Sequence, residues 1–475
     1  MKSKNKVLLV GLGILGGGLA TALWLLKHKA QLTVTDLKSK KDLEPSLKKL
    51  KKYSSKIKFV LGKHRQKDFD ENDIIVVNPA IPTTNTKLKV TQYLNKAKKQ
   101  KKIIENEISL FFRFCRNPII GITGTRGKTT TTNWIGHLLK VKYPQTFIGG
   151  NIPDSPVLSF LDKISKNSPV VLELSCFQLE LPLHKAPHIA IITNLYTDHL
   201  NRYRTLKQYA QIKANIFKYQ TKNDYLILNN DNSWTKYFLS LKPKAQVYFT
   251  SLKKLPKNLN GVYFHKNWIF YQKDGHPEKI TNVKIFNQLW GLHNTDNLLR
   301  AILVAKILKL SNAQIKKQLA SLPQVKMRQE IVFQNNQLTI INDSTGTSPE
   351  AAVVALNRWD HNKNFILITG GTDKNLDFKL LAKKIKEKLP PGHLICLNGS
   401  ATKRLIEELE KLHYSKICNV FDNLGECLTY GLFLAKNKEK AIIAFSPAAA
   451  SFEKFKNEFD RGEKFNQLVK QLVTR

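Results

Sequence analysis

Short apolar runs alternate with longer amphipathic segments along most of the chain. Near the N-terminus, such runs lie at Val7–Val10, Gln31–Thr35, Ile57–Val60 and Ile74–Val77. Later runs occupy Pro118–Ile122, Val170–Leu174, Ile189–Asn194, Phe365–Thr369, His393–Leu397 and Ala441–Phe445. Apolar runs of this length are typical of strands buried on both faces of a parallel sheet. The pattern therefore predicts an α/β fold.

Amphipathic segments at Thr129–Leu139, Asn294–Leu310 and Arg461–Val473 predict helices. With 475 residues, the chain is too long for a single hydrophobic core. A stretch around Pro323 is predicted to be a linker and a hinge. We therefore predict three α/β domains, at residues 1–116, 117–323 and 324–475.

The composition is that of an ordinary globular protein, with 42% hydrophobic and 24% charged residues. No uninterrupted apolar stretch approaches the roughly 18–20 residues of a transmembrane helix. The first apolar run ends in a glycine loop instead of a signal-peptide cleavage site. The five cysteines are scattered and lack CxxC spacing: Cys115, Cys176, Cys396, Cys418 and Cys427. We expect a cytoplasmic protein with reduced thiols, no membrane association, no zinc site and no disulfide framework.

The formal net charge of +41 raises the alternative of a basic, non-enzymatic binder of polyanions. However, 65 of the 77 basic residues are Lys, whereas base and phosphate recognition favours Arg. The lysines are spread over the whole chain, with one dense run at Lys38–Lys56. We therefore expect weak association with polyanions but no specific nucleic-acid partner.

The segment Thr123–Thr131 (TGTRGKTTT) lies between an apolar run and an amphipathic segment, so it is predicted to be a strand–loop–helix element. Gly124 and Gly127 let backbone N–H groups close on phosphate oxygens, and the helix N-terminus presents further unpaired N–H groups. Lys128 supplies a point charge for the outer phosphates, and the Thr129 hydroxyl can ligate Mg2+. The first glycine of the standard P-loop motif is absent. A tight turn without a ligand is the alternative, but the context favours nucleotide binding.

A second glycine loop, Gly11–Gly18, follows the first apolar run, and Asp36 lies twenty residues beyond Gly16. This spacing matches the dinucleotide-binding fingerprint, so an NAD-linked oxidoreductase is a competing hypothesis. A tight turn with no ligand is another. Phosphate loops in both of the first two domains instead indicate two phosphorylated ligands, one for each domain.

Polar residues follow two further apolar runs. Glu173 ends one, and Asp198 and His199 come shortly after the next. Because parallel strands end at one edge of a sheet, these side chains are expected near Thr129. Carboxylate oxygens suit Mg2+, and a neutral His nitrogen can complete a second metal site. By default, Lys213 would be a solvated lysine on a helix.

Seven motifs occur in the order found in the Mur ligases: TGTRGKTT, ELSCFQLE, NLYTDHLNRY, GLHNTDN, NDSTGTSPE, GGTDKNLDF and FSPAAASFEKFKNEFDRG. The chain thus resembles this family over essentially its whole length. ELSCFQLE and the FKNEFDRG tail are most similar to the members that add D-glutamate to UDP-N-acetylmuramoyl-L-alanine in peptidoglycan precursor synthesis.

The resemblance implies a Rossmann-like N-terminal domain for the UDP-sugar, a central P-loop ATPase domain, and a Rossmann-like C-terminal domain for the amino acid. ATP would phosphorylate the substrate carboxylate, and the amino acid amine would attack the acyl phosphate to give an amide, ADP and phosphate. It also implies two Mg2+ ions and carbamylation of Lys213. We further expect the protein to be a monomer.

Residue roles are implied in the same way. ATP would contact Gly124, Thr125, Arg126, Gly127, Lys128, Thr129, Thr130, Asn294, Asn297, Arg328 and Asp343. The UDP substrate would contact Gly13, Ile14, Leu15, Asp36, Asn78, Asn151 and Gln178. The amino acid would contact Thr347, Lys374 and Ser451, and the metal ions Thr129, Glu173, His199 and Lys213. The residues with catalytic roles would be Lys128, His199 and Lys213.

The sequence departs from the family pattern at Ala80, Ser109, Arg126, Pro153, Thr197 and Met327. Two more departures concern the amino acid: Thr345 stands where Lys is frequent, and Glu458 occupies a usually aromatic position. A lost cation and an added anion both disfavour a dicarboxylate. A Mur-type or folate-type ligase that adds a different amino acid therefore stays an alternative.

Overall fold

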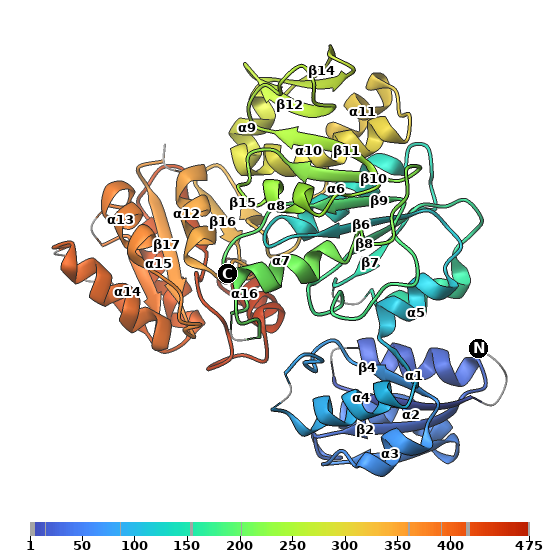
Figure 1. Cartoon of the computed structure of the whole chain (residues 1–475). Coiled ribbons are helices and arrows are strands. Elements are labelled where there is room, and N and C mark those ends of the chain that lie inside the picture. Colours follow the sequence, from blue (N-terminus) through green and yellow to red (C-terminus); the bar gives the residue numbers. More distant parts are fainter. Residues whose placement is uncertain are drawn as a thin grey trace. The chain divides into compact units, whose positions relative to one another are not determined.

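The computed structural model describes residues 5–14, 16–85, 87–152, 155–200, 202–359, 362–390, 392–414 and 419–473 (Figure 1). Within these residues, the strands form three sheets of five, nine and six strands. Most neighbouring strands are parallel, which confirms the predicted α/β class. The chain divides into two compact units: the first comprises Met1–Lys284 and Asn294–Leu322, and the second comprises Ile285–His293 and Pro323–Arg475.

The first sheet has the strand order β3-β2-β1-β4-β5 and is parallel throughout. Its strands are β1 (Lys6–Val10), β2 (Gln31–Asp36), β3 (Ile57–Leu61), β4 (Ile74–Val77) and β5 (Ile103–Glu105). Its helices are α1 (Gly17–Lys27), α2 (Glu44–Leu50), α3 (Gln66–Glu71), α4 (Lys89–Lys99) and α5 (Glu107–Phe114). The strand order reverses between β1 and β4, and ligands bind at such a switch point in open α/β sheets.

The second sheet has the order β14-β13-β12-β11-β10-β9-β6-β8-β7. Its parallel strands are β6 (Ile119–Thr123), β7 (Phe147–Gly150), β8 (Val170–Glu173), β9 (Ile189–Ile192), β10 (Tyr225–Asn229), β11 (Gln246–Ser251) and β12 (Gly261–His265). The antiparallel strands β13 (Trp268–Lys273) and β14 (His276–Asn282) extend one edge. Its helices are α6 (Lys128–Leu139), α7 (Leu206–Ala214), α8 (Thr235–Ser240), α10 (Leu292–Ile307) and α11 (Asn312–Leu319). Strand β6 pairs with both β8 and β9, so their carboxyl ends lie together.

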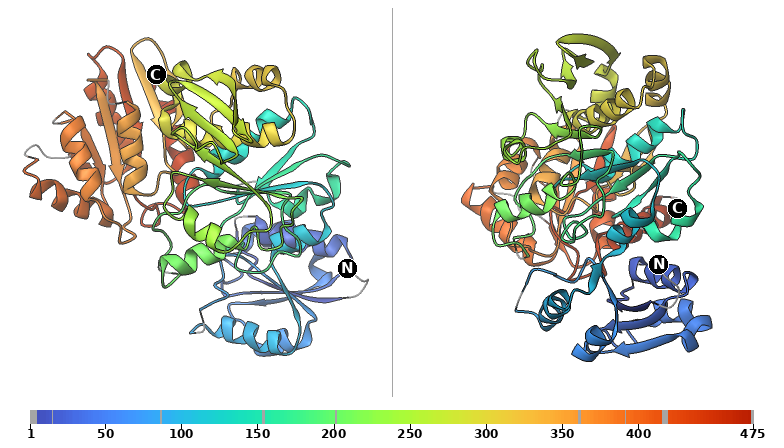
Figure 2. Two further views of the ribbon diagram at one scale, coloured as in Figure 1. Left: turned by 45° about the horizontal axis from the view of Figure 1, so that its top comes forward. Right: turned by 45° about the vertical axis from the view of Figure 1, so that its right-hand side comes forward.

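The third sheet lies in the second unit, and its strand order is β15-β16-β20-β17-β18-β19. Figure 2 shows its strands in orange to red. Its strands are β15 (Glu330–Gln334), β16 (Leu338–Asn342), β17 (Phe365–Gly370), β18 (Leu394–Leu397), β19 (Asn419–Phe421) and β20 (Ala441–Phe445). Its helices are α9 (Lys284–Trp290), α12 (Pro349–Arg358), α13 (Lys379–Lys388), α14 (Ser400–Lys411), α15 (Leu424–Ala435) and α16 (Glu458–Val473). Two apolar clusters fill its faces, one beneath α12, α13 and α14 and the other beneath α15 and α16.

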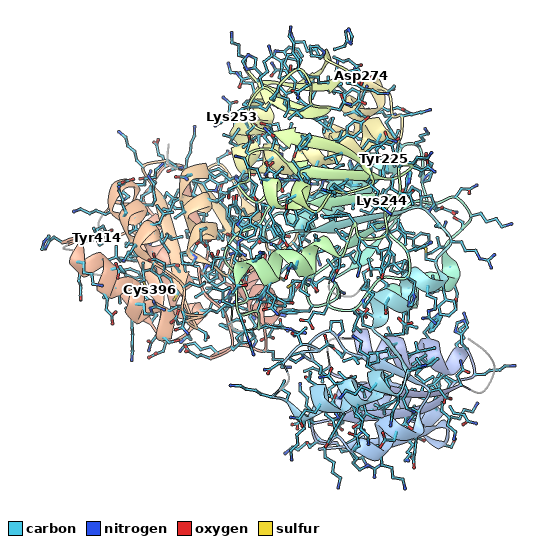
Figure 3. All side chains as sticks on the ribbon, viewed as in Figure 1. Tyr225, Lys244, Lys253, Asp274, Cys396 and Tyr414 are labelled. Carbon is cyan, nitrogen blue, oxygen red and sulfur yellow. The ribbon has the colours of Figure 1, made fainter. Side chains whose placement is uncertain are left out.

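One expectation about the cysteines is wrong. Cys396, near the end of β18, is disulfide-bonded, so the thiols are not all reduced. Figure 3 labels the position of Cys396. Cys115, Cys176 and Cys427 are free and buried, while Cys418 lies outside the described residues. Among the helices that the structure describes, none has the length and apolar character needed to cross a membrane.

Candidate active site

The phosphate loop follows β6 and ends at Gly127, which caps α6 in a left-handed conformation with φ of 78°. A Cβ atom at position 127 would lie 2.3 Å from Asn297 Oδ1, and one at Gly124 would lie 1.9 Å from Thr193 Oγ1. Both contacts are shorter than van der Waals packing allows. The two glycines are therefore required by close approach of the loop to α10 and to the end of β9, besides any ligand.

The end of β9 holds this loop in place. Thr193 Oγ1 donates to the carbonyl of Arg126 (2.7 Å), and the Arg126 N–H donates to Asn194 Oδ1 (2.9 Å). The Thr125 N–H donates to the Asn194 carbonyl (3.0 Å). The Lys128 ammonium donates to the Thr125 carbonyl (3.1 Å), so its charge lies over the loop. Thr193 and Asn194 were not among the predicted site residues. Their only signal in the sequence is that they are the polar end of the run Ile189–Asn194.

Asn294 and Asn297, two of the predicted ATP contacts, lie beside the loop on α10. Asn297 Oδ1 accepts a hydrogen bond from Thr131 Oγ1 (3.3 Å), and Asn297 Nδ2 donates to Asn294 Oδ1 (3.0 Å). Arg300, whose side chain is fully buried, donates to the Thr193 carbonyl (2.8 Å). Helix α10 is thus bonded to the first turns of α6 and to the end of β9, which places Asn294 and Asn297 beside the phosphate loop.

Two predicted metal ligands are in direct contact. Thr129 Oγ1 donates to Glu173 Oε2 (2.7 Å), and Asn151 Nδ2 donates to the other carboxylate oxygen of Glu173 (3.0 Å). A hydroxyl and a buried carboxylate beside a phosphate loop fit Mg2+, which is held by one or two protein oxygens together with phosphates and water. The described residues contain no group of three or more His, Cys, Asp and Glu side chains that could hold a metal alone.

His199 lies on the turn after β9. Its backbone N–H donates to Asp198 Oδ1 (2.9 Å), and its Nδ1 lies 3.9 Å from the same oxygen. Asp198 also accepts from Arg126 Nη1 (3.0 Å), which connects this turn to the phosphate loop. The His199 ring packs edge-on against Phe177, with ring centroids 4.8 Å apart. Ligation of a second metal ion by His199 stays a prediction.

Lys213 is buried, which corrects the default expectation of a solvated lysine. Its Nζ donates to the carbonyl of Gly124 (2.8 Å) and lies 4.5 Å from the centroid of the Tyr209 ring. Burial lowers the pKa of Lys213 to about 7, and the positive charge of Lys128 acts in the same direction. A large share of this amine is therefore neutral and nucleophilic near neutral pH.

Three of the predicted UDP-sugar residues, Gly13, Asp36 and Asn78, lie at the switch point of the first sheet, whereas Asn151 and Gln178 contact Glu173 and Glu107. The Gly13 N–H donates to Asp36 Oδ2 (3.0 Å), and Asn78 Nδ2 donates to the Gly11 carbonyl (3.2 Å). Asp36 and Asn78 therefore fix the glycine loop from the ends of β2 and β4. Ile14 is 40% exposed at the tip of this loop, and Leu15 lies outside the described residues.

Gln178 connects the two sheets of the first unit. Its Nε2 donates to Glu107 Oε1 (3.0 Å), and a Cβ atom at Gly17 would lie 3.0 Å from the other oxygen of that carboxylate. Burial raises the pKa of Glu107. The sequence did not indicate Glu107, because its partners are far away along the chain.

The second unit holds the other predicted residues. Asp343 accepts from the Gln329 N–H (3.1 Å) and from Ser446 Oγ (2.7 Å). Burial raises its pKa to about 6, and the positive charge of Arg328 opposes that shift. Ser451 Oγ is buried and forms no hydrogen bond with the described residues, and its contact with the amino acid stays a prediction.

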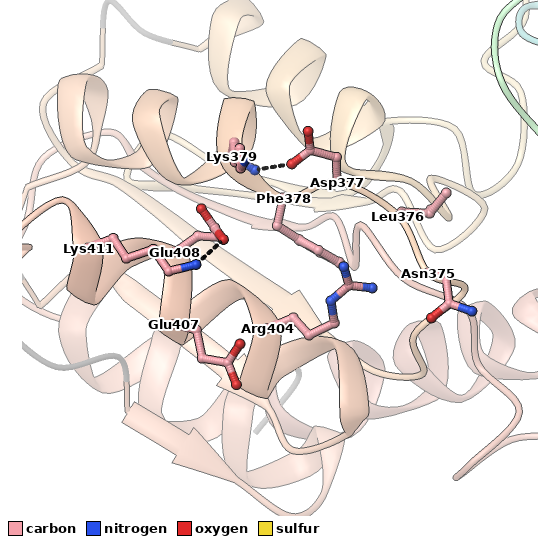
Figure 4. A pocket seen from close by; sticks show the side chains of 9 residues that line it. All are labelled: Asn375, Leu376, Asp377, Phe378, Lys379, Arg404, Glu407, Glu408 and Lys411. Carbon is pink, nitrogen blue, oxygen red and sulfur yellow. Dashed lines mark hydrogen bonds and ion pairs between the residues drawn. The ribbon is translucent and has the colours of Figure 1, made fainter.

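A pocket of about 390 Å³ lies between the segment before α13 and helix α14 (Figure 4). Asn375, Asp377 and Arg404 line it, and Glu408 pairs with Lys411 at its edge. Lys374 directly precedes this lining segment. Neither Lys374 nor the other two predicted amino-acid ligands, Thr347 and Ser451, are among the lining residues.

The fold and the site define an α/β protein with a P-loop nucleotide site. Residues 122–305 match the Mur ligase middle domain, and residues 5–98 match the N-terminal domain of MurD-like Mur ligases. The chain therefore belongs to the Mur ligase family. UDP-N-acetylmuramoylalanine--D-glutamate ligase of Borreliella afzelii is 38% identical over 468 residues, which cover 98% of this chain and 97% of that protein. The enzyme of the same name from Roseiflexus sp. is 34% identical, with 99% of both chains covered.

A solved structure has the same fold. The UDP-N-acetylmuramate-alanine ligase MurC of Thermotoga maritima is 20% identical, with a TM-score of 0.57 over 98% of this chain and 99% of that one. Family membership sets aside the oxidoreductase hypothesis and the hypothesis of a non-enzymatic polyanion binder.

Proposed function

We propose that this protein is an ATP-dependent ligase that joins D-glutamate to UDP-N-acetylmuramoyl-L-alanine during synthesis of the peptidoglycan precursor. The observation that carries the chemistry is the hydrogen bond between Thr129 and Glu173 beside the phosphate loop. The full-length similarity to the D-glutamate ligases supports the choice of substrates.

The reaction has two steps. A carboxylate oxygen of the L-alanyl group attacks the γ-phosphorus of ATP, the bond to the β-bridging oxygen breaks, and ADP leaves. The amine of D-glutamate then attacks the acyl carbon and loses a proton, and phosphate departs with the electrons of the broken C–O bond. Lys128 and the backbone N–H groups of the loop stabilise the charge that gathers on the transferred phosphoryl group.

Thr129 and Glu173 would hold Mg2+, which when bound neutralises phosphate charge and orients the phosphoryl group. We further propose that Lys213 is carbamylated, and that its carbamate and His199 serve a second ion. The burial of Lys213 and its pKa of about 7 support this, because only the neutral amine reacts with CO2.

The substrates are assigned to domains accordingly. Residues 1–116 would bind the UDP-sugar at the switch point of the first sheet, with Asn151 and Gln178 contributing from residues 117–323. Residues 324–475 would bind D-glutamate through Thr347, Lys374 and Ser451, and would offer Arg328 and Asp343 to ATP. Pro323 would act as a hinge, and we expect a monomer in the cytoplasm, where ATP and UDP-sugars are available.

The test is release of ADP in the presence of UDP-N-acetylmuramoyl-L-alanine and each candidate amino acid. We expect turnover with D-glutamate and a loss of about 10²–10³-fold in Lys128→Ala, because a positive charge on the phosphoryl group is removed. Lys140→Ala, an exposed lysine at the other end of α6, is the matched control and should retain full activity. Undiminished turnover in Lys128→Ala, or turnover with another amino acid only, would reject the proposal.

A further inference from the structure

One arginine joins the turn that carries His199 to the first sheet. The backbone N–H groups of Arg202 and Tyr203 both donate to the His199 carbonyl, each at 3.0 Å. The backbone of His199 has φ of 55°, a left-handed conformation that few residues other than glycine adopt. The orientation of His199 therefore depends on where Arg202 and Tyr203 are held.

Both residues are held by the carboxylate of Glu180. Arg202 binds it with two nitrogens, Nε to Oε1 (2.7 Å) and Nη2 to Oε2 (2.9 Å), and the Tyr203 hydroxyl donates to Oε1 (2.9 Å). Thr83, from the first sheet's side, donates to Oε2 through its N–H (3.1 Å) and its hydroxyl (2.7 Å). The side chains of Arg202 and Glu180 are only 9% and 1% exposed, so water screens this pair little.

The guanidinium of Arg202 also reaches the loop that follows β4. Its Nη2 donates to the carbonyls of Pro79 (3.0 Å) and Ile81 (3.1 Å), and its Nη1 donates to that of Ala80 (3.1 Å). The same loop contains Asn78, which fixes the glycine loop through the Gly11 carbonyl. The Arg202 side chain thus binds three successive backbone carbonyls of the loop that borders the proposed UDP-sugar site.

Phe177 completes the connection to His199. The Arg202 guanidinium lies over the Phe177 ring, 4.2 Å from its centroid, and the His199 ring packs against the same phenyl ring. A shift of the guanidinium by a fraction of an ångström would therefore be passed to the imidazole through direct packing.

We propose that Arg202 and Glu180 are a positioning pair that couples UDP-sugar binding at the loop of residues 78–82 to the orientation of His199 in the nucleotide and metal site. This rests on the proposed function, since it assigns the UDP-sugar to that loop. When a sugar nucleotide binds this loop, it fixes the positions of the three carbonyls that accept from Arg202. The guanidinium is then held in one place, and with it Phe177 and the turn that carries His199. An arginine is required here, because its planar guanidinium carries five N–H groups and can bind a carboxylate and three backbone carbonyls at once.

The experiment measures coupling between two ligands by calorimetry. Binding of UDP-N-acetylmuramoyl-L-alanine is measured with and without a non-hydrolysable ATP analogue and Mg2+, in the wild type, Arg202→Lys and Arg204→Lys. Arg204 is an exposed neighbour and serves as the control. We expect the analogue to tighten sugar-nucleotide binding by about 5–20-fold in the wild type and in Arg204→Lys, a common size of coupling between sites.

In Arg202→Lys, the tightening should vanish, while the affinity for each ligand alone changes less than about threefold and kcat falls more than KM rises. Retained coupling in a folded Arg202→Lys variant would overturn the proposal. It would mean that Arg202 and Glu180 only stabilise the fold. If Arg202→Lys does not fold, Phe177→Leu tests the same path, because it removes the ring contact and leaves the ion pair intact. Retained coupling in Phe177→Leu also overturns it. A wild type that releases no ADP with D-glutamate rejects the proposed function instead.

Discussion

Thr129 Oγ1 donates a 2.7 Å hydrogen bond to Glu173 Oε2, and this bond joins the first turn of α6 to the end of β8. The two residues are 44 positions apart, yet they are neighbours because β6 and β8 are parallel partners in the sheet. The same pairing brings Asn151, after β7, to the second oxygen of Glu173. The sheet therefore brings Thr129, a predicted metal ligand, and Asn151, a predicted substrate ligand, to the carboxylate of Glu173.

The pKa of Lys213 leads to a prediction about CO2. Because burial lowers this pKa to about 7, the amine is mostly an ammonium at pH 6 and mostly neutral at pH 8. We expect activity to rise with pH through about 7, and added bicarbonate to stimulate the enzyme most below that pH. A 13C carbamate resonance should appear with labelled bicarbonate in the wild type and in Lys207→Met, an exposed lysine on the same helix, but be absent in Lys213→Met. A resonance that survives in Lys213→Met contradicts the assignment.

Two glycines with the same backbone angle make a matched pair. Gly127 and Gly62 both have φ of 78°, but a Cβ atom at Gly62 meets nothing within 4 Å, whereas at Gly127 it meets Asn297 Oδ1 at 2.3 Å. Gly62→Ala should cost only the left-handed backbone penalty, about 1–2 kcal/mol of unfolding free energy. Gly127→Ala should lose the same amount of unfolding free energy and about 1–3 kcal/mol more from overpacking. It should also lose ATP binding. Denaturant unfolding and nucleotide titration would measure both. Equal losses in the two variants would argue against the close approach of α10.

The sequence predicted the strands better than the contacts between them. The apolar run Ile74–Val77 is a strand with those same bounds, because a strand buried on both faces needs continuous apolar residues. The phosphate loop was recognised because glycines, lysine and threonine occur together. Glu107 and Arg202 are not indicated by the sequence, since their partners Gln178 and Glu180 come from other segments. Arg300 pairs with Asp296 one helical turn away, but its bond to the Thr193 carbonyl also depends on the fold. The spacing singles out Asp36, whose contact with the UDP substrate stays a prediction, but its hydrogen bond from the Gly13 N–H could be found only in the folded loop.

Asp343 should make the stability of the second unit depend on pH. Burial raises its pKa to about 6 in the folded chain, above the value of about 3.9 expected when unfolded. Folding therefore favours the protonated acid, so its contribution is fully present below about pH 4 and is lost as the pH rises through 6. Relative to the wild type, Asp343→Asn should gain on the order of 2–3 kcal/mol in unfolding free energy between pH 4.5 and 7.5. Asp422→Asn, at an 80% exposed side chain, should show no such trend, and a flat difference for Asp343→Asn would contradict the assignment.

The identity of the amino acid depends on how the added anion Glu458 is compensated. Arg461, three residues along α16, is fully buried and feels the charge of Glu458, which opposes the lowering of the Arg461 pKa to about 10 by burial. Thr345, where a lysine is frequent in the family, is engaged locally, since its hydroxyl donates to the Met327 carbonyl (2.6 Å). We therefore expect D-glutamate to be accepted despite Glu458. KM for D-glutamate should change less than about threefold in Glu458→Gln, as in the control Asp460→Asn, because the positive charge of Arg461 offsets the negative charge of Glu458 and salt screens what remains. A KM that falls tenfold in Glu458→Gln alone would mean that Glu458 repels D-glutamate, and that an amino acid with a cationic or neutral side chain should be sought as the natural acceptor.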